Sequence, residues 1–144
     1  MKHEINTEIR IEATKEEVWD LLIDFEKYKE WNPFIERIEG DQQVGGKLFV
    51  RLGGMSFRPK VKTNVQQQEF SWLGRFIVPG LFDGNHIFIL KENPDNSVTF
   101  IQKERFSGIL VPLKKKWLSR EVKLQFEAMN KALKSRVESN KGSN

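Results

Sequence analysis

The sequence predicts one α+β domain in which a curved, seven-stranded antiparallel sheet wraps around a long C-terminal helix. Three patterns carry this prediction. Apolar residues alternate with polar ones over the first dozen residues, a period of two that is typical of a half-buried strand. Six further segments of this kind, separated by Gly, Pro and Asn, occupy residues 34–107. From about Leu113 to Val137 the apolar spacing changes to three and four, which indicates an amphipathic helix.

The N-terminal part begins with this strand and continues with two short helices. Ile5 to Ile11 carry the alternation of the strand. Thr14 and Glu17 have the spacing of a capping box, which predicts a helix that begins after Thr14. A second brief helix over residues 24–31 ends at Asn32-Pro33, because the residue before a proline is disfavoured in the α region. We therefore expect both helices to lie between the first and second strands.

Glycine, proline and asparagine mark the turns between the later strands. They occur at Gly45-Gly46, Gly53-Gly54, Pro79-Gly80 and residues 93–96. Large apolar side chains gather on one face of these strands, so the other face should be wet. The long helix is the element that can cross the apolar, concave face. A twisted sheet around a single helix is not filled at both ends, and such gaps are common ligand sites.

The long helix has two faces. Its apolar stripe should pack on the sheet and consists of Leu118, Val122, Phe126, Met129, Leu133 and Val137. The opposite arc should face solvent and holds Arg120, Lys123, Glu127, Asn130, Lys131 and Lys134. Glu121 and Gln125 project beside the apolar stripe, where polar groups need partners. They either hydrogen-bond to the sheet or point into a wet cavity.

His86 and Glu104 are the most specific polar candidates for a site. With a turn at Pro94–Asn96, antiparallel register pairs His86 with Glu104 and Phe88 with Gln102. A slip of two residues would pair His86 with Gln102 instead. An imidazole beside a carboxylate in an apolar pocket could perform general acid–base catalysis, or it could be a polar pair that anchors two strands. No nucleophile, oxyanion hole or metal constellation accompanies the pair in the sequence.

Two surface segments could serve an interaction. The connection from Phe76 to Phe82 is unusually apolar, so it could pack in the core, fold as a lid over the cavity mouth, or contact a membrane or a protein. The run Lys114-Lys115-Lys116 could suit phosphate or an anionic lipid. We interpret this run as a solvated face, since charge runs usually are.

Composition narrows the classes of function. The chain carries 24 Lys and Arg against 20 Asp and Glu, a net charge of +4, without a nucleic-acid-binding signature, so we expect no nucleic-acid partner. It has no cysteine and only His3 and His86, which excludes thiol catalysis, disulfides and a His-rich transition-metal site. No phosphate-cradling glycine motif is present, and we expect no cofactor and no metal.

Domain organisation should be simple. The 144 residues fit one domain, which we place at 1–138, followed by a frayed polar tail over 139–144. The absence of cysteine and of an apolar N-terminal stretch favours a cytoplasmic location. We expect a monomer or a weak dimer.

Several segments resemble one protein family. The run from Ile11 to Leu22 and the segment Tyr28-Lys29-Glu30-Trp31-Asn32-Pro33 resemble the polyketide cyclase/dehydrase branch of the START/SRPBCC superfamily. The resemblance covers nearly the whole chain and continues in residues 72–74, 79–86, 104–108 and 126–130. Lys29 differs from the family's Tyr-Pro-x-Trp-Asn-Pro pattern, in which proline is common at this position.

The resemblance implies the helix-grip fold and, for small bacterial members, a hydrophobic ligand. The family includes lipid-transfer domains, relatives of the birch-pollen allergen, aromatic-polyketide cyclases and domains similar to activators of a heat-shock chaperone ATPase. Since its cyclases share no catalytic motif that can be placed on this chain, the resemblance implies no catalytic residues.

Three functions are compatible with these patterns. The leading hypothesis is a module that binds a lipid, a polyketide or an aromatic compound in an internal cavity. The residues expected to bind this ligand are Trp31, Trp72, Phe76, Phe82, His86, Phe88, Glu104, Phe106, Glu121, Gln125 and Met129. The alternatives are a cyclase or dehydratase with His86 and Glu104 as proton carriers, and a co-chaperone-like domain. The latter would bind a protein through residues 76–82 and the basic end of the helix.

Overall fold

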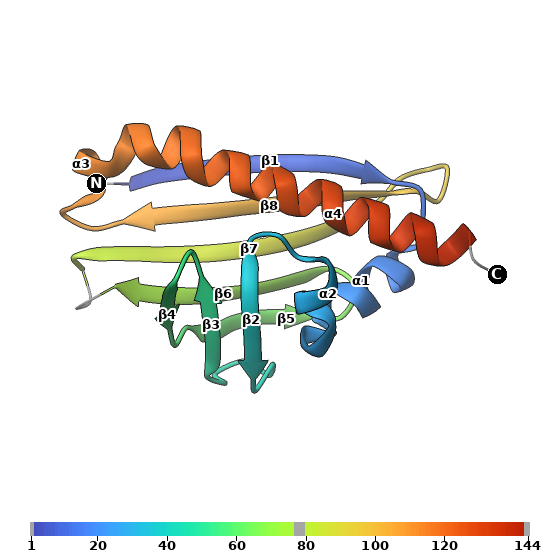
Figure 1. Cartoon of the computed structure of the whole chain (residues 1–144), viewed down its shortest axis with the longest axis horizontal. Helices are drawn as coiled ribbons and strands as arrows, with labels where there is room; N and C mark the ends of the chain where they lie inside the picture. The colour runs from blue at the N-terminus through green and yellow to red at the C-terminus, as the bar shows by residue number, and fades with distance from the viewer. Residues whose placement is uncertain (1, 77–79, 143–144) are drawn as a thin grey trace.

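The structure of the chain is a computed structural model that describes residues 2–76 and 80–142 (Figure 1). The elements of its first half are β1 (Lys2–Ile11), α1 (Lys15–Ile23), the 3₁₀ turn η1 (Phe25–Lys27), α2 (Tyr28–Trp31), β2 (Ile35–Gly40), β3 (Leu48–Leu52), β4 (Met55–Phe57) and β5 (Lys60–Val65). Those of its second half are β6 (Glu69–Phe76), β7 (Phe82–Glu92), β8 (Val98–Ser107), α3 (Val111–Trp117), the π-helical segment η2 (Leu118–Val122) and α4 (Lys123–Gly142).

The strands form two antiparallel groups under one long helix. Five strands hydrogen-bond in the order β1-β8-β7-β6-β5, and three in the order β2-β3-β4. An isolated bridge between Lys47 and Lys60 joins the two groups. Figure 1 shows α3, η2 and α4 running as one helix across the larger sheet, with α1 and α2 beside its C-terminal half. The predicted α+β helix-grip fold is confirmed, including the short helices between β1 and β2.

The predicted number of strands needs one correction. We expected one seven-stranded sheet, whereas the described residues form eight strands in two groups. The expected strand over residues 57–65 divides into β4 and β5 at Pro59, which has no N–H to donate to a ladder. The carbonyl of Pro59 accepts from the Leu48 N–H at 2.9 Å, so the chain at the break still contacts β3.

Side-chain caps define the N-terminal helices. Thr14 Oγ1 accepts from the Glu17 N–H at 3.1 Å, and Glu17 Oε1 accepts from the Thr14 N–H at 3.2 Å, which confirms the capping box. Helix α2 ends at Trp31 as predicted. Asn32 Oδ1 then accepts from the N–H groups of Phe34 and Ile35, both at 2.8 Å. These bonds turn the chain into β2.

The apolar stripe of the long helix packs on the sheet as predicted. The residues of this stripe, which are Leu118, Val122, Phe126, Met129, Leu133 and Val137, are all buried. Asn130 contradicts the prediction that it faces solvent, since it is 2% exposed and lies on the buried side of α4. The helix also contains the π-helical turn η2, in which Leu118 and Val122 are buried against the sheet side. Single π-helical turns within α-helices are frequent near functional sites.

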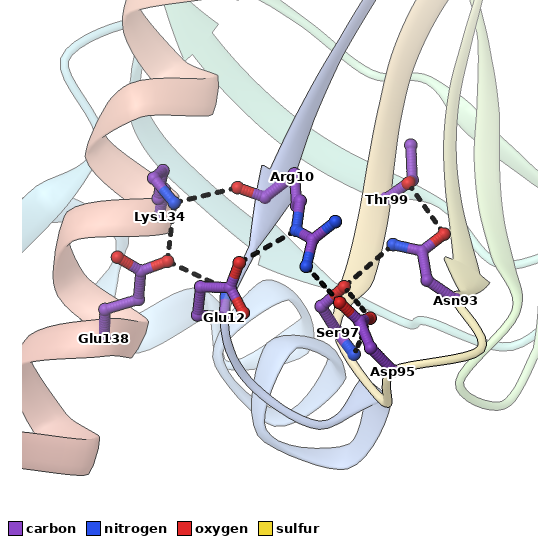
Figure 2. A network of polar contacts seen from close by, with 8 residues as sticks. All are labelled: Arg10, Glu12, Asn93, Asp95, Ser97, Thr99, Lys134 and Glu138. Atoms are coloured by element: carbon purple, nitrogen blue, oxygen red, sulfur yellow. Dashed lines mark hydrogen bonds and ion pairs between the residues drawn. The ribbon is translucent and has the colours of Figure 1, made fainter.

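A polar network fixes the helix to the sheet at the end opposite α3 (Figure 2). Lys134 Nζ donates to the carbonyl of Arg10 at 2.9 Å and to Glu138 Oε2 at 2.6 Å. Glu138 Oε2 also accepts from the Glu12 N–H at 2.8 Å. The guanidinium of Arg10 contacts Glu12 at 2.8 Å and also pairs with Asp95 in the turn between β7 and β8. The network therefore connects α4, the end of β1 and that turn.

Candidate ligand-binding site

A cavity of about 450 Å³ lies between the larger sheet, the β3–β4 hairpin and the N-terminal part of the long helix. The sheet contributes Trp72 from β6, Phe82 and His86 from β7, and Glu104 and Phe106 from β8. The hairpin contributes Leu52, Met55 and Phe57, and the helical side contributes Leu110, Lys114, Trp117, Leu118, Val122 and Gln125. Phe34 completes the wall. Apolar side chains thus surround a small number of polar groups, which is the usual composition of a small-molecule site.

Two other depressions on the described surface have different walls. The larger, of about 790 Å³, lies beside η1, α2 and β2 and is lined mostly by charged residues such as Asp24, Glu26, Glu36 and Arg37. The smaller, of about 280 Å³, lies between α1 and the end of α4. Charged surface grooves hold water well, so we assign the candidate site to the apolar cavity.

Two glycines make room for side chains of the cavity wall. Gly74 and Gly84 lie opposite each other on β6 and β7. A Cβ atom at Gly84 would overlap Oε2 of Glu104, and one at Gly74 would lie 3.4 Å from the ring of Phe57. Both glycines have ordinary strand dihedrals, so the space beside them explains their use better than the conformation of their backbone.

His86 and Glu104 are paired as the sequence predicted. The register of β7 and β8 places His86 opposite Glu104 and Phe88 opposite Gln102, which confirms the predicted pairing. His86 Nδ1 lies 3.4 Å from Glu104 Oε1, within ion-pair range, and the two side chains are 2% and 12% exposed. The imidazole centroid lies 4.7–4.9 Å from the ring centroids of Trp72, Phe88 and Phe126. A polar pair is therefore enclosed by aromatic rings on one side and open to the cavity on the other.

A buried chain of hydrogen bonds continues from His86 into the core. His86 Nε2 contacts Gln102 Oε1 at 2.9 Å, and Gln102 Nε2 donates to Asn130 Oδ1 at 2.8 Å and to the Phe126 carbonyl at 3.3 Å. Asn130 Nδ2 donates to Thr7 Oγ1 at 2.9 Å, and that hydroxyl donates to the Gln102 carbonyl at 2.8 Å. The chain connects β7, β8, β1 and α4, and it satisfies polar groups that would otherwise be costly to bury.

The structure brings six of the eleven predicted binding residues to the cavity wall, namely Trp72, Phe82, His86, Glu104, Phe106 and Gln125. Phe88 and Met129 are fully buried behind the wall, and Glu121 faces solvent. Trp31 lies in α2 against Tyr28, at a ring distance of 5.2 Å and away from the cavity. The side chain of Phe76 is outside the described residues.

Sequence reasoning missed part of the wall and most of the polar chain. Helical periodicity alone was enough to place Asn130 on the buried face, because it lies four residues after Phe126 and three before Leu133. Gln102 was named only as a pairing partner. The β3–β4 hairpin left no comparable signal, because its approach to the cavity depends on how the two strand groups pack.

Helix α3, which contributes to the cavity wall, presents exposed apolar and basic side chains. Trp117 and Leu113 of α3 are 52% and 80% exposed, and Lys114 lines the cavity. Residues 77–79 of the proposed lid lie outside the described residues, so the lid, the membrane contact and the co-chaperone-like interaction stay predictions. No helix within the described ranges is long and apolar enough to cross a membrane.

Comparison with known proteins identifies the family. The sequence profile described as polyketide cyclase / dehydrase and lipid transport matches residues 2–138. The chain belongs to this family. Among curated proteins, none matches the chain by sequence.

Solved structures share the fold at low sequence identity. A START superfamily protein from Mycobacterium smegmatis is 21% identical, with a TM-score of 0.72 over 95% of this chain and 98% of that one. The Zhui aromatase/cyclase from a Streptomyces species is 13% identical, with a TM-score of 0.73 over 96% and 94%. A protein of unknown function from Staphylococcus aureus is 15% identical, with a TM-score of 0.76 over 99% and 97%. At these identities the likeness shows the fold alone.

Proposed function

We propose that this protein binds a hydrophobic small molecule in the cavity between its larger sheet and its long helix. The observation that carries the proposal is the cavity of about 450 Å³, whose walls are mostly apolar and include the polar side chains of His86, Glu104, Lys114 and Gln125. Its volume falls within the range of about 300–1,000 Å³ that small-molecule sites occupy. The family supports the same class of ligand, since its description joins polyketide chemistry with lipid transport.

Binding would be driven by the apolar wall. Each 100 Å² of apolar ligand surface removed from water contributes about 2.5 kcal/mol, before the cost of immobilising the ligand. The buried hydrogen bonds from His86 to Asn130 hold one side of the wall in place without a ligand. A preformed wall lowers the cost of binding, because fewer side chains must be ordered.

Native mass spectrometry of the protein purified from cells tests this proposal. We expect a bound apolar compound in a one-to-one complex, and denaturing extraction would identify its chemical class. A protein that is empty, and that also fails to bind a panel of lipids, polyketides and polycyclic aromatic compounds, would contradict the proposal.

Catalysis of cyclisation or dehydration is a second candidate function, favoured by the position of the His86–Glu104 pair in the cavity wall. In this role the pair would move a proton to or from a bound substrate. The extracted compound, or a polyketide that binds, would be incubated with the wild-type protein and with Glu104→Gln, which cannot exchange that proton. Product formation by the wild type alone supports catalysis, and recovery of unchanged compound from both would count against it.

A further inference from the structure

Two backbone carbonyls fix which group donates and which accepts in each bond of the buried hydrogen-bond chain. The carbonyl of Phe126 can only accept, so the end of the Gln102 amide that lies 3.3 Å from it is the NH₂ group. The carbonyl of Gln102 also can only accept, and it receives the Thr7 hydroxyl proton at 2.8 Å. Thr7 Oγ1 must therefore accept from Asn130 Nδ2, which leaves Asn130 Oδ1 to accept from Gln102. Each bond in the chain agrees with the others.

This order of donors and acceptors fixes the tautomer of His86. Since the NH₂ end of Gln102 points to Phe126 and Asn130, its Oε1 faces His86 Nε2 at 2.9 Å. An amide oxygen donates nothing, so His86 Nε2 must carry a hydrogen. In the neutral imidazole the other nitrogen, Nδ1, is then an acceptor.

Two acceptors would face each other unless a proton lies between them. His86 Nδ1 is 3.4 Å from Glu104 Oε1, and both atoms belong to nearly buried side chains. A lone pair against a carboxylate at that distance is repulsive in a site of low dielectric. A proton on His86 Nδ1 would remove this repulsion and give an imidazolium beside a carboxylate, and a proton on Glu104 Oε1 would give an imidazole beside a carboxylic acid.

In both of these forms, Oε2 of Glu104 can accept a hydrogen bond from a ligand. Oε2 of Glu104 lies over Gly84, where the missing side chain makes room for it, and Glu104 forms part of the cavity wall. Within residues 2–76 and 80–142, no hydrogen bond to this oxygen is present. It is a carboxylate oxygen in one form and a carbonyl oxygen in the other, so it accepts in both.

We propose that the cavity selects apolar ligands that carry a hydroxyl group, such as a phenol, an enol or an alcohol, and that this hydroxyl donates to Glu104 Oε2. This inference rests on the proposed binding function and specifies the ligand class for the same site. Ligands with an ether, a ketone or a carboxylate at this position present an acceptor to an acceptor, and they bind more weakly. A hydrogen bond to a partly enclosed acid–base pair gives about a tenfold to hundredfold preference.

A matched series of naphthalenes tests the inference. Dissociation constants for 2-naphthol, 2-methoxynaphthalene and 2-naphthoate would be measured by NMR titration of ¹⁵N-labelled protein, a method that also reports weak binding. We expect 2-naphthol to bind about tenfold or more tightly than 2-methoxynaphthalene, and 2-naphthoate to bind most weakly. Resonances of Gly84 and Phe106 should shift on binding, since they lie beside Glu104.

Two variants separate a role in recognition from a role in folding. Glu104→Leu removes the acceptor, so 2-naphthol and 2-methoxynaphthalene should bind equally. Glu104→Gln should keep the preference, because its amide NH₂ can donate to His86 Nδ1 while its oxygen faces the cavity. The dispersion of the NMR spectra checks that both variants are folded, and Gly84→Ala, which displaces Glu104 Oε2, gives a second way to remove the preference.

The outcomes distinguish the two proposals. Equal binding of 2-naphthol and 2-methoxynaphthalene by the wild type would overturn the hydroxyl inference while leaving a hydrophobic binding site. A preference for 2-naphthol that survives in Glu104→Leu would also overturn it, since another residue would then accept the hydroxyl. Binding of none of the three, together with an empty protein in native mass spectrometry, would overturn the binding function and the inference with it.

Discussion

The buried hydroxyl of Tyr28 gives a direct spectroscopic test of the fold at one residue. Tyr28 is the single tyrosine of the chain, and its hydroxyl donates to the carbonyl of Leu22. Burial, with a smaller contribution from the charge of Asp24, raises the pKa of this hydroxyl well above its ordinary range. The ionised side chain is thus compatible with the unfolded chain and not with the folded one.

We therefore expect the phenolate absorbance to appear only when the protein unfolds. The raised pKa contributes to the free energy of unfolding fully below the pKa of an unfolded tyrosine, about 10, and this contribution is lost as the pH rises above it. Absorbance and circular dichroism would be followed together during an alkaline titration. Tyr28→Phe should lack the absorbance change, and phenolate formation near pH 10 with native circular dichroism would contradict the expected burial.

The pKa of Asp95 shifts in the opposite direction to that of Tyr28, because hydrogen bonds to the charged form of the carboxyl group favour its ionisation. The hydroxyl of Ser97 donates to Asp95 Oδ1 at 2.6 Å and its backbone N–H donates at 3.1 Å. These bonds, with the nearby charge of Arg10, lower the pKa of Asp95. Their stabilising effect is present above the pKa of an unfolded aspartate and is lost as the pH falls through the lowered value.

Ser97→Ala should move the pKa of Asp95 back toward its ordinary value, because the largest stabilising bond is removed. An NMR titration of the side-chain carboxyl carbon would measure the shift. Thr99→Val is a matched control, since the Thr99 hydroxyl donates to Asn93 and makes no direct bond to Asp95. An unchanged pKa in Ser97→Ala would show that the backbone N–H and Arg10 suffice.

At the scale of elements, Asn130 joins α4 to β1 and β8 through two buried side-chain hydrogen bonds. Asn130→Leu keeps the number and branching of the side-chain heavy atoms but removes an acceptor from Gln102 and a donor from Thr7. We expect the free energy of unfolding to fall by about 2–4 kcal/mol, because each buried group that loses its partner costs about 1–3 kcal/mol. Urea unfolding would measure this change.

The neighbouring position provides the control for that prediction. Lys131 is exposed on the same turn of α4, so Lys131→Ala should change the free energy of unfolding by less than about 0.5 kcal/mol. Equal effects of the two substitutions would mean that the buried chain adds little to stability and serves only to orient His86.

The elements themselves were largely predictable, because each depends on local patterns. The capping box at Thr14, the break at Asn32-Pro33 and the helical stripe from Leu118 to Val137 follow from spacing and backbone sterics. Asn130 was misplaced because polarity was given more weight than its helical phase. Asparagine is usually exposed, and its burial here depends on partners in two distant strands.

At the scale of the whole molecule, the sequence predicted the cavity but only part of its wall. The register that pairs His86 with Glu104 follows from a short turn, so it could be predicted. The contribution of Leu52, Met55 and Phe57 could not, because it requires the separate β2-β3-β4 group to close over the larger sheet. Long-range packing of this kind leaves no periodicity in one segment.

Filling the cavity from the helix tests whether this space is where the ligand binds. Val122 lies in η2 and lines the cavity, so the indole of Val122→Trp should occupy space that a ligand needs. We expect this variant to be purified without the bound compound that we expect in the wild type. Native mass spectrometry measures the bound fraction, and thermal unfolding checks that the variant is folded.

Leu124→Trp is the matched control, because Leu124 lies on the same helix and is 58% exposed to solvent. It adds the same side chain outside the cavity and should keep the ligand at wild-type stoichiometry. A ligand that remains in Val122→Trp would place binding elsewhere, whereas loss from both variants would point to the exposed face of the helix. Loss from Val122→Trp alone assigns the ligand to the space between the sheet and the helix that Val122 lines.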